Sequence, residues 1–513
     1  MHLKKHRRRN AQRRGIGKYE GIIALAMILA PMGAASAATL LQSSTIFPAP
    51  YGSPLPAPAG PGGGAGGLPS GESPGYLLNF TNFGKPAGRD LAARGIYLHG
   101  SLQQAEASVV SGGHKQGSDY MGIGFWGFDI DTGKAFGIPG GTIDFTISTQ
   151  VGNTLSSANA GASKTFNNWG FGNGVRLVNL YYDQSLMNGV LHIAAGRMNP
   201  LTSSPFTSPY ELSPGFHMMP WYCSFFTMSC GNTYAFNLNA SKPGYTVGTW
   251  GSFITYHPAP FWYVKAGIFE SEPVETTTYN NGGWPGADWG LNESHGAYVP
   301  VEVGYITTPA NSLYPSNIQI GGDVDTTEYA DKYYNAKMRP IAEFGGAPLY
   351  HDRTSGIFAG IQQTVLRFSD DPRSTRGVAI FASGDWDVSG LETVQQEYMG
   401  GLIVTGPFPS RAADTLNLLF DYQVFDSRLK ADRQLIAALH GRNYTMRNET
   451  GFEINYAFAV APGLSVSPYT QFVANPDQMG LSIPEPHDTY AFSVGVRAVI
   501  KFETLLGLPT LRQ

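Results

Sequence analysis

Charged residues are scarce in this chain of 513 residues, at 14% of the total, whereas soluble domains carry about 25%. Long apolar runs are also missing: no stretch of eighteen apolar residues lies between Tyr76 and Phe502, which excludes a conventional transmembrane helix there. A Walker loop, an HExxH motif and a GxSxG motif are absent as well. The sequence therefore predicts no enzyme, no cofactor and no metal site.

Basic residues become few once the N-terminus is set aside. Residues 1–37 have the form of a secretory signal peptide, with a basic start, a short apolar stretch from Ile22 to Met32 and the cleavage signature Ala35-Ser36-Ala37. An uncleaved inner-membrane anchor is the alternative. The segment holds eight Lys/Arg and one Glu, so the remaining chain would carry 26 basic and 37 acidic residues, a net charge of -11. Nucleic acid is therefore not an expected partner.

Cysteine is limited to two residues, Cys223 and Cys230. In an exported protein this spacing predicts a disulfide that closes a small loop. A zinc site is the weaker alternative, because no histidine stands beside the two thiols. Between the signal peptide and these cysteines lies a Pro/Gly-rich leader, residues 38–75, which cannot bury a core and is expected to be a disordered tether in the periplasm.

Alternation of apolar and polar residues is the main pattern from Tyr76 onward. Thr142–Val151 and Thr415–Val424 both follow it, and Phe492–Phe502 follows it near the C-terminus. A period of two places the two sets on opposite faces of a strand. Strands of about ten residues with ionised residues on the polar face favour a transmembrane β-barrel over a soluble sandwich.

Aromatic residues, 12% of the chain, support the barrel. Outer-membrane barrels place such residues in girdles at the two membrane interfaces. The aromatic residues that we assign to or near predicted strands are Tyr181, Tyr182, Phe261, Trp262, Tyr263, Tyr422, Tyr456, Tyr469 and Tyr490. For any single one of them, packing in a core is the simpler interpretation.

Several segments resemble the OprB-type carbohydrate-selective porins of Gram-negative bacteria. The segment Glu453–Tyr456 with Ala461–Pro476 is similar to their penultimate hairpin, and Phe492–Phe502 to their closing strand. Leu366–Pro372 with Gly377–Phe381 resembles a mid-barrel strand and turn, and the stretch from Arg176 to Arg197 an earlier hairpin. The Cys223/Cys230 segment resembles their paired-cysteine loop.

The resemblance implies an all-β fold: one transmembrane antiparallel barrel of about 16 strands over residues 76–502, followed by a C-terminal tail, residues 503–513. It also implies passive diffusion of glucose-like carbohydrates across the bacterial outer membrane, with lipid around the barrel. We expect the C-terminal strand to pair with one soon after Tyr76, and the longer loops to lie outside the cell. Both a monomer and a homo-oligomer such as a trimer fit the sequence.

In a porin the residues that line the lumen decide what passes. Alternation and the resemblance to family strands select the pore-lining candidates Asp144, Arg176, Lys265, Arg367, Asp421, Gln423, Glu453, Asn455, Gln471 and Arg497. Trp221, Trp284 and Trp289 lie in expected loops and could stack on sugar rings; loop packing or membrane anchoring is the alternative. The competing hypothesis for the whole chain is a secreted, soluble, β-rich polysaccharide-binding protein or glycosidase.

Overall fold

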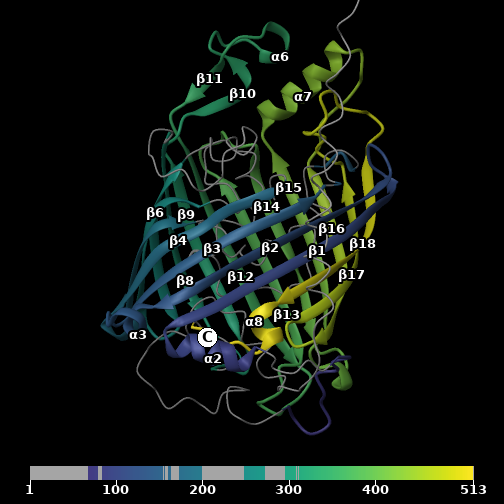
Figure 1. The fold of residues 1–513 in the computed structure, drawn as a ribbon. Helices are drawn as coiled ribbons and strands as arrows, with labels where there is room; N and C mark the ends of the chain where they lie inside the picture. Colours follow the sequence, from purple (N-terminus) through teal and green to yellow (C-terminus); the bar gives the residue numbers. More distant parts are fainter. Residues whose placement is uncertain are drawn as a thin grey trace, which may run out of the picture.

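Sixteen antiparallel strands close into one barrel, as expected from the alternation (Figure 1). The computed structural model describes residues 68–78, 84–153, 155, 160–162, 173–198, 248–271, 295–307, 309 and 311–511. The barrel strands are β1 (Ile96–Gly112), β2 (Gly117–Asp131), β3 (Gly141–Gly152), β4 (Gly174–Leu186), β5 (Leu191–Met198), β6 (Thr249–Ala259), β7 (Trp262–Ser271), β8 (Gly296–Ile306), β9 (Ser316–Asp325), β12 (Thr354–Arg367), β13 (Gly377–Asp387), β14 (Val394–Thr405), β15 (Thr415–Phe425), β16 (Glu449–Ala461), β17 (Leu464–Ala474) and β18 (Tyr490–Lys501).

The barrel closes between its first and last strands. β1 pairs antiparallel with β18, with Ser101 opposite Lys501 and Gly112 opposite Ala491. This confirms that the C-terminal strand pairs with one soon after Tyr76. Closure leaves no unpaired sheet edge in the barrel, which is the condition that a sheet must meet to span a bilayer. None of the helices among the described residues is long and apolar enough to cross a membrane.

The connections differ between the two ends of the barrel. One end carries short turns, such as Pro462-Gly463, where Gly463 adopts a φ of +72°. The opposite end carries longer insertions that include the small sheet of β10 (Tyr329–Asn335) and β11 (Pro348–His351) and the helices α6 (Ile341–Phe344) and α7 (Ser427–Leu439) (Figure 1). Short turns face the periplasm in barrels of this kind, so we assign the long-loop end to the cell exterior.

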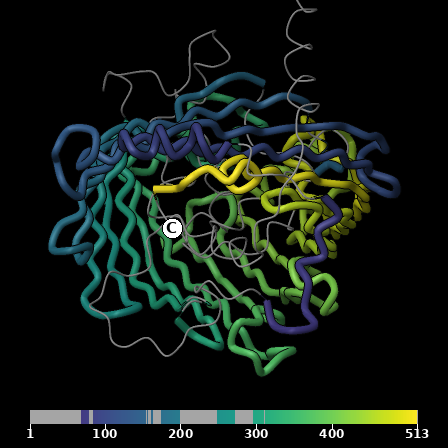
Figure 2. The backbone as a smooth tube through the Cα atoms, turned by 60° about the horizontal axis from the view of Figure 1, so that its bottom comes forward, coloured from purple at the N-terminus to yellow at the C-terminus, as the bar shows by residue number. Residues whose placement is uncertain are grey.

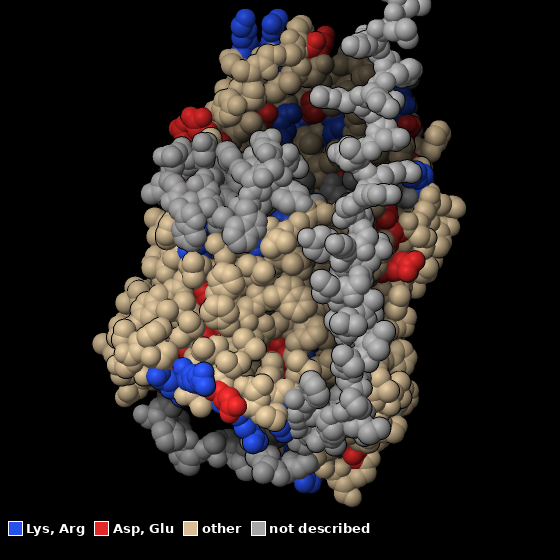
Figure 3. Space-filling view, viewed as in Figure 1, with Lys and Arg blue, Asp and Glu red and all other residues tan. Residues whose placement is uncertain are grey.

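Alternation along each strand separates an apolar outer face from a polar inner face. On β15 the outward Leu418 and Phe420 are 37% and 41% exposed, whereas the inward Asp421 is fully buried. Over the wall formed by β1 to β4 most of the surface is uncharged, and charged side chains gather toward the two ends (Figure 3). Such an apolar band suits contact with lipid.

The aromatic residues divide between the two faces. Tyr182, Trp262 and Tyr490 are 37% to 47% exposed on the outer surface, in agreement with an interfacial position. Three other expected girdle residues, Tyr181, Tyr263 and Tyr469, are at most 3% exposed. The girdle assignment is wrong for these three, because their position in the alternation is that of the inward polar residues, as Tyr263 and Lys265 illustrate.

The two segments that flank the barrel meet at the short-turn end. Helix α2 (Lys85–Ala93) precedes β1, and helix α8 (Phe502–Leu506) follows β18; the two segments run side by side across this end (Figure 2). Gly84 N donates to Leu506 O at 3.0 Å. The expected tail, residues 503–513, thus begins within a helix that packs on α2, and its last two residues lie outside the described part.

The last residues of the Pro/Gly-rich leader also contact the barrel. Ser73 N donates to Pro409 O at 2.8 Å, and Leu77 N donates to Val460 O at 3.0 Å. Glu72 accepts hydrogen bonds from Ser374 Oγ at 2.8 Å and from Arg376 Nη1 at 3.3 Å. Residues 68–75 are therefore anchored to short turns rather than free. The predicted signal peptide and residues 38–67 lie outside the described residues.

Candidate functional site

The inner face of the barrel carries nine of the ten predicted pore-lining residues. Asp144, Arg176, Lys265, Asp421, Gln423, Glu453, Asn455, Gln471 and Arg497 are at most 6% exposed. The outer neighbours of these residues are apolar, as Phe452 and Ile454 are around Glu453, at 46% and 45% exposed. A polar side chain on this face points to the inside of the barrel, while its neighbours in sequence face outward.

A ladder of hydrogen bonds crosses the inner face from β15 to β18. Asn417 Nδ2 donates to Asn455 Oδ1 at 2.7 Å, and Asn455 Nδ2 donates to Glu453 Oε1 at 2.8 Å. Gln471 Nε2 donates to Glu453 Oε2 at 2.9 Å, and Ser493 Oγ donates to Gln471 Oε1 at 3.3 Å. The register causes this order, because Asn417 pairs with Asn455, Glu453 with Gln471, and Gln471 with Ser493.

A second polar group lies on β7 and β8. Lys265 and Glu302 are register partners, and Lys265 Nζ lies 4.0 Å from Glu302 Oε1. Tyr263 Oη donates to Glu302 Oε1 at 2.6 Å, and Lys265 Nζ lies 4.5 Å from the centre of the Tyr263 ring. Opposite charges and an aromatic ring thus occur together on one part of the wall.

Arginines contribute positive charge to the inner face from two further strands, β4 and β18. Arg176 on β4, Arg197 on β5 and Arg497 on β18 are among the largest fully buried side chains. Arg197 is buried too, but its register partners Leu180 and Trp250 belong to the outward sets of their strands. Its Nη2 donates to Gly248 O at 2.7 Å and its guanidinium lies 5.8 Å from the Trp250 ring. The wall therefore combines cationic donors with carboxylate and amide acceptors.

Arg367 is not brought to this wall. It ends β12 at the short-turn end, where its Nη2 donates to Asp371 O at 2.6 Å and to Ser374 O at 3.1 Å. The prediction that Arg367 lines the lumen is wrong. A register irregularity between Thr364 and Leu366 interrupts the alternation just before Arg367. Arg367 closes the turn between β12 and β13.

Sequence reasoning missed several inward residues. Glu302, Glu397 and Asn417 are at most 2% exposed on the inner face. Alternation could have identified Glu302, because the flanking Val301 and Val303 are apolar and face outward. The predicted sugar-stacking residues Trp221, Trp284 and Trp289 and the predicted disulfide of Cys223 and Cys230 lie outside the described residues.

This arrangement offers neighbouring hydrogen-bond donors and acceptors along a passage through the membrane. Amides such as Asn455 and Gln471 can act as donor and as acceptor, and Glu453 accepts. A hydroxyl-rich solute that loses water on entry can exchange those hydrogen bonds for bonds to the wall. The chemistry is that of selective passage, with groups held in place by their neighbours.

Comparison with known proteins agrees with this geometry. The profile of the carbohydrate-selective porin family, OprB, matches residues 115–502. Porin B of Pseudomonas aeruginosa is 23% identical over 365 residues, which cover 68% of this chain and 76% of that protein. The putative porin QuiX of Acinetobacter baylyi is 23% identical over 432 residues, covering 80% and 90% respectively.

The fold is also that of a solved structure. The high-pH structure of Pseudomonas putida OprB superposes with a TM-score of 0.71 at 21% identity, covering 84% of this chain and 99% of that one. The family profile spans most of the barrel, from β1's hairpin partner to the end of β18. The chain is thus an outer-membrane porin that belongs to the carbohydrate-selective OprB family.

Proposed function

We propose that the barrel lets small, glucose-like carbohydrates diffuse passively across the outer membrane, without a catalytic step. The hydrogen-bonded ladder from Asn417 to Ser493 is the observation that carries this proposal. It presents acceptors and donors a few ångströms apart, as the hydroxyl groups of a sugar do. Because its members already bond one another, each contact with a solute replaces an existing contact, which permits weak binding and release.

A cationic side chain on the last strand of the ladder, Arg497, complements its acceptors. Arg497 on β18 and Glu453 on β16 are both buried on the inner face, on either side of β17, where Tyr469 is buried too. A lumen with separated positive and negative groups orients dipolar hydroxyls while attracting neither cations nor anions strongly. This favours neutral polar solutes. The secreted-enzyme hypothesis loses its support, since a closed barrel with an apolar exterior suits a bilayer.

Swelling of proteoliposomes tests the proposal. The purified protein is reconstituted, and vesicles are diluted into isotonic glucose, a disaccharide, or a tetrasaccharide. We expect fast swelling in glucose, slower swelling in the disaccharide and none in the tetrasaccharide. Equal rates for protein-containing and protein-free vesicles in glucose would remove the carbohydrate assignment, provided that heat-modifiable migration on a gel confirms a folded barrel.

Two further proposals concern export and loops. Residues 1–37 are proposed to be removed after Ala37 during export, which N-terminal sequencing of protein from isolated outer membranes tests directly. The pairing of Cys223 with Cys230 is proposed for the mature protein. Mass spectrometry of a non-reduced digest would detect the linked peptide, and a digest with two free thiols would contradict it.

A further inference from the structure

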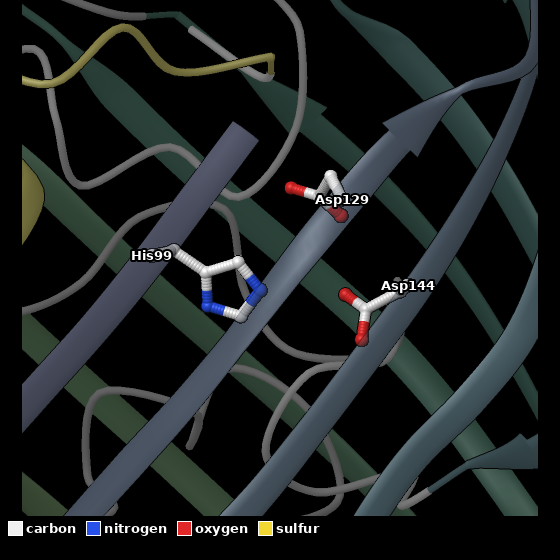
Figure 4. Close-up of side chains that lie close together, drawn as sticks. All are labelled: His99, Asp129 and Asp144. Carbon is white, nitrogen blue, oxygen red and sulfur yellow. The ribbon is translucent and has the colours of Figure 1, made fainter. Parts of the chain in front are cut away.

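A histidine and two aspartates meet on the inner face near the short-turn end, apart from the ladder. His99 lies on β1, Asp129 on β2 and Asp144 on β3, three neighbouring strands. One nitrogen or oxygen of each lies within 4.8 Å of the others (Figure 4). We propose that these three residues bind a divalent transition-metal cation such as Zn²⁺ inside the lumen.

A glycine gives the imidazole room to reach the carboxylates. His99 is the register partner of Gly127 on β2. A Cβ at Gly127 would stand 2.7 Å from His99 Cε1 and 2.9 Å from His99 Nε2, closer than packed atoms allow. Without that Cβ the ring extends from β1 over β2 toward Asp129 and Asp144 (Figure 4). Gly127 thus leaves space for the ring, and the same missing Cβ also avoids a clash with Phe145 O.

The aspartates are placed as like charges on adjacent strands. Asp129 is the register partner of Asp144, an arrangement that repels when both are ionised. Both are largely shielded, at 9% and 6% exposed. A divalent cation between them turns this repulsion into attraction. Thr146 Oγ1 donates to Asp144 Oδ1 at 2.9 Å, an outer contact that fixes the orientation of a ligand carboxylate.

The histidine nitrogen supplies independent support. His99 Nε2 is shielded from solvent and has no hydrogen-bond partner among the described residues. A buried ring nitrogen without a partner is costly, and a metal ion is one group that satisfies it. His99 Nε2 and the two carboxylates together offer one nitrogen and two oxygen ligands to a cation.

The ligand set selects the class of cation. Calcium and magnesium prefer oxygen ligands, whereas an imidazole with two carboxylates suits zinc and its first-row neighbours. Metal–ligand bonds of about 2.1 Å place tetrahedral ligand atoms about 3.4 Å apart. The widest pair of the three groups would therefore close by at most about 1.4 Å, within the reach of side-chain rotation, and a further position would stay open to water.

Metal binding to the full-length folded protein in detergent tests the proposal without any transport measurement. The protein is freed of metal with a chelator, and Zn²⁺ binding is measured by equilibrium dialysis. The substitutions His99→Gln and Asp144→Asn remove one ligand each. His192→Gln is the matched control, because His192 is an inner-face histidine with one carboxylate partner, Asp183, at 3.4 Å.

We expect binding in the parent protein that weakens at least about tenfold in both ligand variants, since loss of even an outer-shell partner costs 10- to 100-fold. The His192→Gln control should bind as the parent does. Bound Co²⁺ should show visible absorption bands that His99→Gln shifts or abolishes. Equal affinities in the parent and both ligand variants would overturn the proposal, as would an equal loss in the control. Heat-modifiable migration verifies that each variant is folded.

Discussion

Glu453 provides a direct test of charge in the lumen. Its carboxylate accepts hydrogen bonds from Asn455 and Gln471 and is 2% exposed on the inner face of β16. The substitution Glu453→Gln keeps the size of the side chain and one acceptor oxygen but removes the negative charge. We expect the folded barrel to persist and the ion selectivity of the pore to change.

The size of the change follows from Coulomb's law. An ion that passes about 6 Å from the carboxylate interacts with it by about 0.7 kcal/mol at the dielectric constant of water. Salt at 0.1 M screens roughly half of this, because the Debye length is about 10 Å. The charge attracts cations and repels anions, so its removal should lower the cation-to-anion permeability ratio about three- to fourfold.

The zero-current potential across a planar bilayer in a salt gradient measures this ratio. Glu106 offers a matched control, because it is exposed on the outer face of β1 while the flanking Ala105 and Ala107 are at most 2% exposed on the inner face. Glu106→Gln should leave the ratio unchanged. An unchanged ratio in Glu453→Gln, or an equal change in both variants, would refute the assignment of Glu453 to the conducting lumen.

Three further perturbations have expected outcomes. Lys265→Met leaves the Glu302 carboxylate buried beside an apolar side chain, so we expect a loss of about 3 kcal/mol in the free energy of unfolding. Adding Glu302→Gln to the same chain should largely restore it. Unfolding in denaturant, followed by tryptophan fluorescence, measures both effects, and a double variant as unstable as the single one would contradict the expectation. Glu72→Ala removes the partner of Arg376 and should speed proteolysis within residues 68–78, whereas an unchanged cleavage rate would show that the backbone contacts suffice. Burial raises the pKa of Asp432 in α7 from 3.8 to about 6, so its contribution to stability is complete below about pH 4 and is lost as the pH rises through 6. Hydrogen exchange in α7, corrected for intrinsic rates, should therefore be faster at pH 7 than at pH 4, and Asp432→Asn should abolish this difference; a difference that persists would contradict the assignment.

Period-two alternation predicted the parts of the barrel where strands are regular. Asp421, Glu453 and Gln471 lie on the inner face because their strands keep a strict two-residue repeat in which most outward side chains are apolar. Arg367 shows the limit of the pattern. A register irregularity precedes it, and its side chain bonds to the turn that follows β12 instead of facing the inside of the barrel.

Contacts between strands were beyond a sequence reading, because they depend on register. Glu453 meets Gln471, and Asp129 meets Asp144, only once the hairpin turns fix which residues stand opposite. The sequence therefore predicted no metal site, although His99 comes near both aspartates in the folded barrel. The helix α7 and the β10–β11 sheet, both inserted in long loops, were likewise not foreseen, because strand alternation carries no information about loops.

Conductance of single channels under glucose titration tests the central claim most directly. Purified protein is inserted into a planar bilayer in fixed salt, and current is recorded as glucose is added. The polar wall from Asn417 to Ser493 predicts stepwise channels whose current falls saturably as glucose occupies the lumen. Channels whose current follows only the bulk conductivity of the glucose solution would contradict a sugar-interacting lumen, while leaving the porin barrel itself in place.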